Sequence, residues 1–165
     1  MMLYVLRHGV AEETAAEGGD RARRLTPAGR KKLRAAADGM RAIGLRFDLI
    51  LTSPFARAAE TAAIVAAAYD GQTPVQELAA LEQGHAPADM LRGLRPFARR
   101  PRLLIVGHEP GLSGLVALLL TGAADGFRMV LKKGGLVTLE VHELGRRSGA
   151  SLRAVLTPRH LRRFG

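Results

Sequence analysis

Three short motifs with reactive side chains each follow an apolar run of this sequence. The first run ends in arginine, histidine and glycine. The second ends in serine and proline, with an arginine one helical turn later, and the third ends in glycine and histidine. These motifs are Arg7-His8-Gly9, Ser53-Pro54 with Arg57, and Gly107-His108. Because ligands of open α/β sheets bind beyond the carboxyl ends of the strands, we expect the three motifs to meet in one pocket.

Two arginines and two histidines in one pocket indicate that it binds an anion, and phosphate in particular. Guanidinium groups match phosphate oxygens with paired hydrogen bonds. Helices that begin near Pro54 and Pro110 would aim their backbone N–H groups at the same place. The sequence has neither a Gly-x-x-x-x-Gly-Lys-Ser/Thr stretch nor an Asp-rich cluster for magnesium. Chemistry without a metal then needs a side-chain nucleophile, and neutral imidazole is one.

Strands and helices that would position these motifs alternate along the chain. We expect strands over residues 3–6, 49–52, 73–78, 101–108, 135–141 and 150–156, and helices over 25–44, 56–68, 87–97 and 109–120. This alternation predicts an α/β fold, a three-layer sandwich whose mostly parallel central sheet is flanked by helices. The last two strands would add an antiparallel edge near the C-terminus.

Local signals fix some boundaries of these elements. Thr26 and Pro27 are typical of a helix start, and Gly44 of its end. The polar segment 11–24 is predicted to be a loop, and a turn around Gly145–Gly149 would join the last two strands. Ser53 is expected to cap the helix that follows it.

Composition limits the class of protein. The chain has 165 residues, 47% of them hydrophobic and 24% charged, which fits one globular domain over residues 1–165. It has no cysteine, and neither a membrane-spanning run nor a signal-peptide start is visible, so we expect a cytoplasmic protein without a membrane partner. The net charge is +10, but the basic residues are dispersed and not interleaved with aromatics, so we do not expect a nucleic-acid partner.

The same motifs resemble the histidine phosphatase superfamily, also called the phosphoglycerate mutase-like superfamily. The matching stretches cover most of residues 3–120 and are "LYVLRHGVAE", "RRLTPAGRKKL", "DLILTSPFARAAETA" and "LLIVGHEPGLSGLVALL". The short length and the "RHGxAE" and "RxLTPAGR" patterns look most like the SixA branch of protein-phosphohistidine phosphatases.

This resemblance implies a role for each matching residue. His8 would be the nucleophile that takes the phosphoryl group, and water would then hydrolyse the phosphohistidine formed on it. Three side chains would bind the phosphoryl oxygens, and a glycine would let the backbone pass close to the site. These are Arg7, Arg57 and His108, and Gly9. Neither a cofactor nor a metal is implied. The partner would be a phosphocarrier or phosphotransfer domain that bears phosphohistidine, and we expect the enzyme to be a monomer.

The proton donor is the least defined part of this assignment. Glu82 lies in the region where relatives carry an acid and is a possible acid here, whereas Glu109 would more naturally cap the helix at Pro110. A phosphoramidate leaves as imidazole, which needs less help from an acid than an alkoxide does. A site without an acid therefore favours phosphohistidine as the substrate.

Two alternatives stay open from the sequence. The same core could hydrolyse a small phosphate ester or anhydride with Glu82 as the acid. The chain could instead be a non-catalytic basic protein that binds phosphate or nucleic acid.

Overall fold

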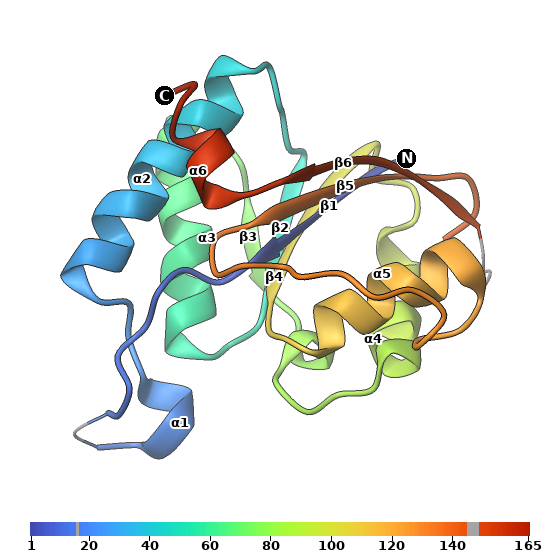
Figure 1. Ribbon diagram of the computed structural model, residues 1–165, viewed down its shortest axis with the longest axis horizontal. Coiled ribbons are helices and arrows are strands. Elements are labelled where there is room, and N and C mark those ends of the chain that lie inside the picture. Colours follow the sequence, from blue (N-terminus) through green and yellow to red (C-terminus); the bar gives the residue numbers. More distant parts are fainter. Residues whose placement is uncertain (16, 145–148) are drawn as a thin grey trace.

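A computed structural model describes residues 1–15, 17–144 and 149–165 and shows a six-stranded sheet with the order β3-β2-β4-β1-β5-β6 (Figure 1). The strands are β1 (Met2–Arg7), β2 (Leu49–Thr52), β3 (Val75–Glu77), β4 (Arg102–Gly107), β5 (Leu136–Val141) and β6 (Ala150–Leu156). Strands β3, β2, β4 and β1 are parallel to one another. Strand β5 runs antiparallel to β1, and β6 antiparallel to β5. The predicted mostly parallel sheet with an antiparallel edge is confirmed.

Helices cover both faces of this sheet, as Figure 1 shows. The helices of the described chain are α1 (Gly19–Ala22), α2 (Pro27–Ala42), α3 (Ala56–Ala68), α4 (Pro87–Leu94), α5 (Gly111–Thr121) and α6 (Pro158–Leu161). Helices α2 and α3 cover one face of the sheet and α4 and α5 the other, whereas α1 stands apart from it. Successive residues of β1 point to opposite faces, as the period of two in a strand requires. Leu3 and Val5 pack in one core cluster with α4 and α5, and Tyr4 and Leu6 in another with α2 and α3. The predicted three-layer sandwich is therefore confirmed.

Helix α2 has the caps that the sequence indicates. The Gly29 N–H donates to Thr26 Oγ1 over 2.9 Å, which satisfies one free donor of the first turn. At the other end Gly44 has a φ of 81°, and the Leu45 N–H donates to the Met40 carbonyl over 3.0 Å. This bond across a left-handed residue is typical of a helix that a glycine ends.

Two predicted elements differ from the structure. Segment 11–24 is not all loop, because it contains α1, whose side chains bond to residues far along the chain. The helix predicted over 87–97 ends at Leu94 and continues as a 3₁₀ turn, Arg95–Phe97, since Pro96 lacks the N–H that an α-helix needs. Of the predicted turn around Gly145–Gly149, residues 145–148 lie outside the described part of the chain. No helix within that part is long and apolar enough to cross a membrane.

Candidate active site

The carboxyl ends of three adjacent strands bring the predicted motifs together. Strand β4 lies between β1 and β2, with Gly107 opposite Arg7 and Val106 opposite Thr52. The next residue of each strand therefore leaves the sheet at the same edge. The rings of His8 and His108 lie there with their centroids 5.1 Å apart.

His8 is held as a neutral imidazole with a defined tautomer. Its Nδ1 lies 2.7 Å from the Gly9 carbonyl oxygen. Because a carbonyl can only accept a hydrogen bond, Nδ1 carries the proton and Nε2 keeps its lone pair. Burial lowers the pKa of His8 to about 3, and the nearby positive charges of Arg57 and Arg7 act in the same direction. Nε2 is therefore available as a nucleophile at neutral pH.

Gly9 lies in tight packing next to His8. A Cβ at this position would lie 3.2 Å from Leu25 Cδ2, which is closer than most such contacts. A side chain at this position would thus point to Leu25 and Leu33 in the core. The role in phosphate binding that the resemblance implies for Gly9 stays a prediction. The Gly9 N–H donates to Thr61 Oγ1 over 3.1 Å, and Thr61 in turn donates to the Arg57 carbonyl over 2.7 Å. Thr61 therefore links the backbone after His8 to α3.

His108 is oriented by Ser53. Its ring is 2% exposed, and Nε2 lies 2.9 Å from Ser53 Oγ. Ser53 Oγ also accepts from the Phe55 N–H over 3.2 Å, so its own proton is free to point at Nε2. The predicted helix cap is wrong, because α3 begins after Phe55 and no side chain caps it. Ser53 instead positions a ring 55 residues away, a contact that no local pattern indicates.

With Ser53 Oγ as the donor to Nε2, Nδ1 of the neutral His108 ring carries the proton and has no acceptor within the described residues. Nδ1 is buried and lacks a hydrogen-bond partner within the described part of the chain. Burial, together with the positive charge of Arg57, lowers the pKa of His108 to about 4. Buried donors without a partner are rare in proteins. An anion in the pocket would give Nδ1 its acceptor.

Arg7 also holds an unpartnered donor at the pocket. Its Nη1 donates to the Leu131 carbonyl over 2.9 Å, which fixes the side chain against the segment that precedes β5. Its Nε is buried and has no hydrogen-bond partner among the described residues. Arg7 Nε and His108 Nδ1 are thus two buried donors at one strand edge, as a phosphate site needs.

Arg57 is buried beneath the α1 segment and already engaged. It is 2% exposed, and its Nη1 donates to the Asp20 carbonyl over 2.6 Å. Its Nη2 donates to Asp20 Oδ2 over 2.8 Å and to Gln83 Oε1 over 2.7 Å. A phosphoryl group that binds Arg57 must therefore share it with the Asp20 carboxylate or displace that carboxylate. Sequence reasoning missed Asp20, which stands in a polar segment without any motif.

Glu82 lies at the rim in an ion pair with Arg21. Arg21 Nη1 is 2.9 Å from Oε2, and Nη2 is 3.3 Å from Oε1, so the pair is bidentate. The neighbouring Gln83, rather than Glu82, contacts Arg57. The structure thus ties Glu82 to α1 and gives it no hydrogen bond to either histidine within the described residues.

Glu109 does not behave as a simple helix cap. Pro110 is the N-cap of α5, and no side chain bonds to it there among the described residues. The carboxyl of Glu109 is half-buried, and its Oε1 lacks a hydrogen-bond partner in the described part of the chain. Burial raises the pKa of Glu109, while Ser113 and Arg7 lower it to a smaller extent.

Two further observations complete the site. Glu60, which the sequence analysis leaves without a catalytic role, pairs with Arg30 over 2.8 Å and ties α3 to α2. Among the described residues, no group of three or more histidine, aspartate or glutamate side chains converges as metal ligands would.

Comparisons with known proteins agree with this geometry. The sequence model of the histidine phosphatase superfamily (branch 1) matches residues 3–86. An uncharacterized protein of Picosynechococcus sp. (strain PCC 7002) is 36% identical over 159 residues, which cover 92% of this chain and 87% of that protein.

Solved structures share the fold over almost the whole chain. The protein histidine phosphatase SixA complexed with tungstate has a TM-score of 0.85 at 23% identity, over 98% of this chain and 99% of that one. A putative SixA from Nakamurella multipartita has a TM-score of 0.77 at 25% identity, over 95% of both chains. The alpha-ribazole phosphatase of Shigella flexneri has a TM-score of 0.74 at 20% identity, over 96% of this chain and 97% of that one.

Proposed function

This chain belongs to the histidine phosphatase superfamily, and we propose on that basis that it hydrolyses protein phosphohistidine without a metal, through a covalent intermediate on His8. The proposal rests on one observation, that the free lone pair of His8 Nε2 and two hydrogen-bond donors without an acceptor occur in the same site. His8 Nε2 is unprotonated, and two buried donors beside it, Arg7 Nε and His108 Nδ1, lack an acceptor within the described part of the chain. A phosphoryl group fits all three.

The reaction would proceed in two displacements at phosphorus. In the first, the lone pair of His8 Nε2 forms a bond to phosphorus while the P–N bond of the substrate breaks. The substrate imidazole, protonated on its other ring nitrogen, leaves as neutral imidazole and takes no proton from the protein. In the second, water attacks phosphorus, the bond to His8 breaks, and inorganic phosphate and neutral His8 result.

Arg7, Arg57 and His108 would stabilise the charge on the three phosphoryl oxygens during both displacements. Arg7 and His108 are already positioned by Leu131 and Ser53, whereas Arg57 must be shared with, or released by, the Asp20 carboxylate. Pre-oriented donors of this kind contribute most to phosphoryl transfer, since they need no rearrangement as the charge develops.

The position of Glu82 supports phosphohistidine over a small ester. An ester needs an acid to protonate the leaving oxygen, and Glu82 is the acid that the sequence offers. Its two oxygens are bound by Arg21 instead. Phosphohistidine makes no such demand, because imidazole is a better leaving group than an alkoxide. Relatives of this fold that are named for a small ester, such as alpha-ribazole phosphatase, make the ester the second candidate.

The test compares both substrate classes with excess EDTA present. A histidine-phosphorylated phosphocarrier and a panel of small phosphate esters are each incubated with the wild type, His8→Ala and Glu82→Gln. We expect fast phosphate release from the phosphoprotein, lost in His8→Ala and kept in Glu82→Gln. His142→Ala, a change at an exposed histidine, is the matched control.

Two outcomes would contradict the proposal. Turnover mainly of esters, reduced by Glu82→Gln, would support the small-substrate alternative. Turnover of neither class would leave a binding protein, which salt-dependent binding of nucleic acid would then test.

A further inference from the structure

A small surface hollow of about 30 Å³ lies beside the backbone that follows His8. It runs between the N-terminal half of α2, the turn before β5 and the start of α6. We call it the basic groove. The residues that matter for the argument are Gly9, Val10, Lys32, Lys133, Pro158 and Arg162.

The basic groove shares a wall with the candidate active site. Gly9 and Val10 follow His8 directly in the chain. The Gly134 N–H donates to the carbonyl oxygens of both Arg7 and His8 over 3.0 Å, so the turn that carries Lys133 rests on the backbone of the nucleophile. The basic groove therefore begins at the residue that follows His8 in the chain.

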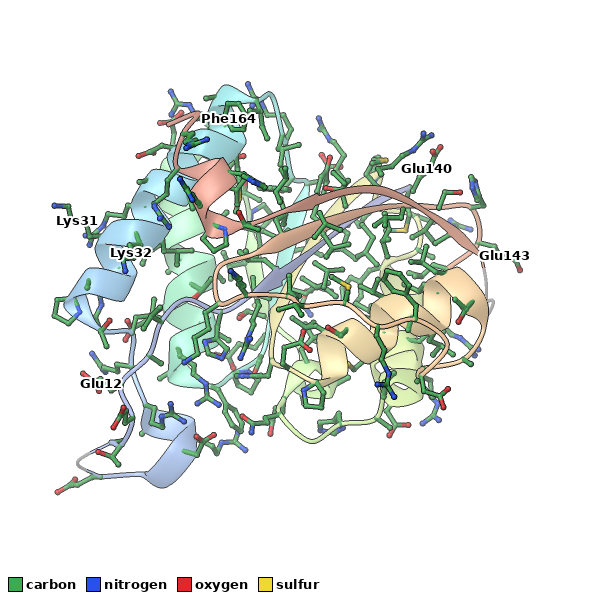
Figure 2. The ribbon with its side chains drawn as sticks, viewed as in Figure 1. Glu12, Lys31, Lys32, Glu140, Glu143 and Phe164 are labelled. Carbon is green, nitrogen blue, oxygen red and sulfur yellow. The ribbon has the colours of Figure 1, made fainter. Side chains whose placement is uncertain are left out.

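The charged side chains that line the basic groove are all positive. Lys32 and Lys133 are exposed and Arg162 is partly exposed, and no acidic side chain lines the groove. These three side chains form no ion pair with any described residue. Figure 2 shows Lys32 on the outer surface of α2. Two acids near the site are paired, Asp20 with Arg57 and Glu82 with Arg21, whereas Glu109 Oε1 has no hydrogen-bond partner within the described residues.

We propose that the basic groove binds an acidic segment of the substrate protein next to its phosphohistidine. This proposal rests on the proposed function and names the kind of partner that the site accepts. Three unpaired cations beside the pocket would attract carboxylates and steer them to it. Apolar contact is also available, because Val10 is 38% exposed and Pro158 lines the groove. No aromatic side chain lines it, which favours a peptide over the bases of a nucleic acid.

The experiment compares three phosphohistidine compounds that differ only outside the reacting group. These are free phosphohistidine, a short phosphohistidine peptide flanked by aspartates, and the same peptide with asparagines in their place. For the wild type at low salt we expect kcat/KM for the acidic peptide to be about tenfold above that of the neutral one. This follows because an exposed ion pair contributes about two- to fivefold and the groove offers three cations. The preference should disappear near 1 M salt, where the Debye length is about 3 Å.

A matched pair of variants locates the effect. Lys32→Glu/Lys133→Glu should lower kcat/KM for the acidic peptide by about tenfold and leave free phosphohistidine within about twofold, which also shows that the variant is folded. Arg99→Glu/Arg100→Glu changes the net charge by the same amount. These two exposed residues lie just before β4, at the amino end of that strand and so at the end opposite the active site. This double variant should keep the wild-type preference.

Four other outcomes would refute the docking site, the location of the effect in the groove, the peptide partner, or the phosphatase activity. Equal turnover of all three compounds by the wild type refutes the docking site and keeps the phosphatase. An equal loss in both double variants refutes the groove, since net charge alone would then explain the preference. Tight binding of an oligonucleotide that Lys32→Glu/Lys133→Glu abolishes, without any preference among the peptides, assigns the groove to nucleic acid instead. No hydrolysis of any compound refutes the proposed function and this inference together.

Discussion

His8 should make the folded protein less stable in mild acid, and replacing it should remove that effect. The folded-state pKa of His8 is lowered to about 3 by burial, whereas an unfolded histidine has a pKa near 6.5. Between these values the unfolded chain binds a proton that the folded chain does not. The stability from the neutral His8 is therefore fully present above pH 6.5 and is lost as the pH falls toward 3.

The size of the effect follows from the same two values. From pH 6.5 to pH 5 is about 1.5 pH units, and each unit is about 1.4 kcal/mol. The free energy of unfolding should therefore fall by about 2 kcal/mol between pH 7 and pH 5 because of His8 alone. His108, whose pKa is lowered to about 4, should add a similar loss. The acidic groups contribute equally to wild type and variant, so they cancel in a comparison.

The assay is urea unfolding of the wild type and His8→Asn at pH 7 and pH 5. Buffers without phosphate or sulfate are needed, because an anion in the pocket would stabilise the folded state. Asparagine keeps a donor for the Gly9 carbonyl, which His8 Nδ1 bonds over 2.7 Å. We expect the fall in the variant to be about 2 kcal/mol smaller than in the wild type. His142→Asn, on an exposed residue, should keep the wild-type fall.

One result would refute the reasoning. If wild type and His8→Asn lose the same stability between pH 7 and pH 5, His8 takes up a proton in the folded protein. Its Nε2 would then not be a free lone pair through this range, and the assignment of His8 as the nucleophile would lose its physical basis.

Three further changes test the contacts around the site. Ser53→Ala removes the partner of His108 Nε2 and the acceptor of the Phe55 N–H. We expect the free energy of unfolding to fall by about 1–3 kcal/mol and kcat/KM to fall at least about tenfold. Unchanged kinetics would exclude a positioning role for Ser53. Asp20→Asn should strengthen tungstate binding about fivefold in calorimetry, because a neutral amide competes less well for Arg57 than a carboxylate does; weaker binding would show that Asp20 positions Arg57 and does not compete. Thr26→Ala removes the cap of α2 and should cost about 1 kcal/mol in urea unfolding with kcat/KM unchanged; an unchanged midpoint would mean that the Gly29 N–H finds another acceptor.

Much of this protein could be read from short stretches of its sequence. The strands around residues 3, 49 and 103 are apolar throughout because both faces of the sheet are covered, and such runs are visible without any tertiary information. The start and end of α2 depend on Thr26 and Gly44, whose preferences are local. That His8, Arg57 and His108 share a pocket followed from a rule of topology, since parallel strands end at one edge.

The partners of the site residues could not be predicted in this way. Ser53 orients His108 across 55 residues, Thr61 holds the Gly9 N–H across 52, and Asp20 occupies Arg57 across 37. Each contact joins groups of distant segments that only the packed layers bring within 3.1 Å of one another. Glu82 illustrates the same limit, because the sequence offers it as an acid and the fold places it in an ion pair with Arg21.

The sequence by itself therefore determined the strands, the two ends of α2 and the types of side chain that leave the sheet at the carboxyl ends of its strands, because these depend on neighbours along the chain. The tertiary structure decided which donors stay free. Arg7 Nε and His108 Nδ1 lack a partner in the described part of the chain, while Arg57 and Glu82 have theirs. Whether a buried polar atom has a partner depends on distances between segments, and only the folded chain sets those distances.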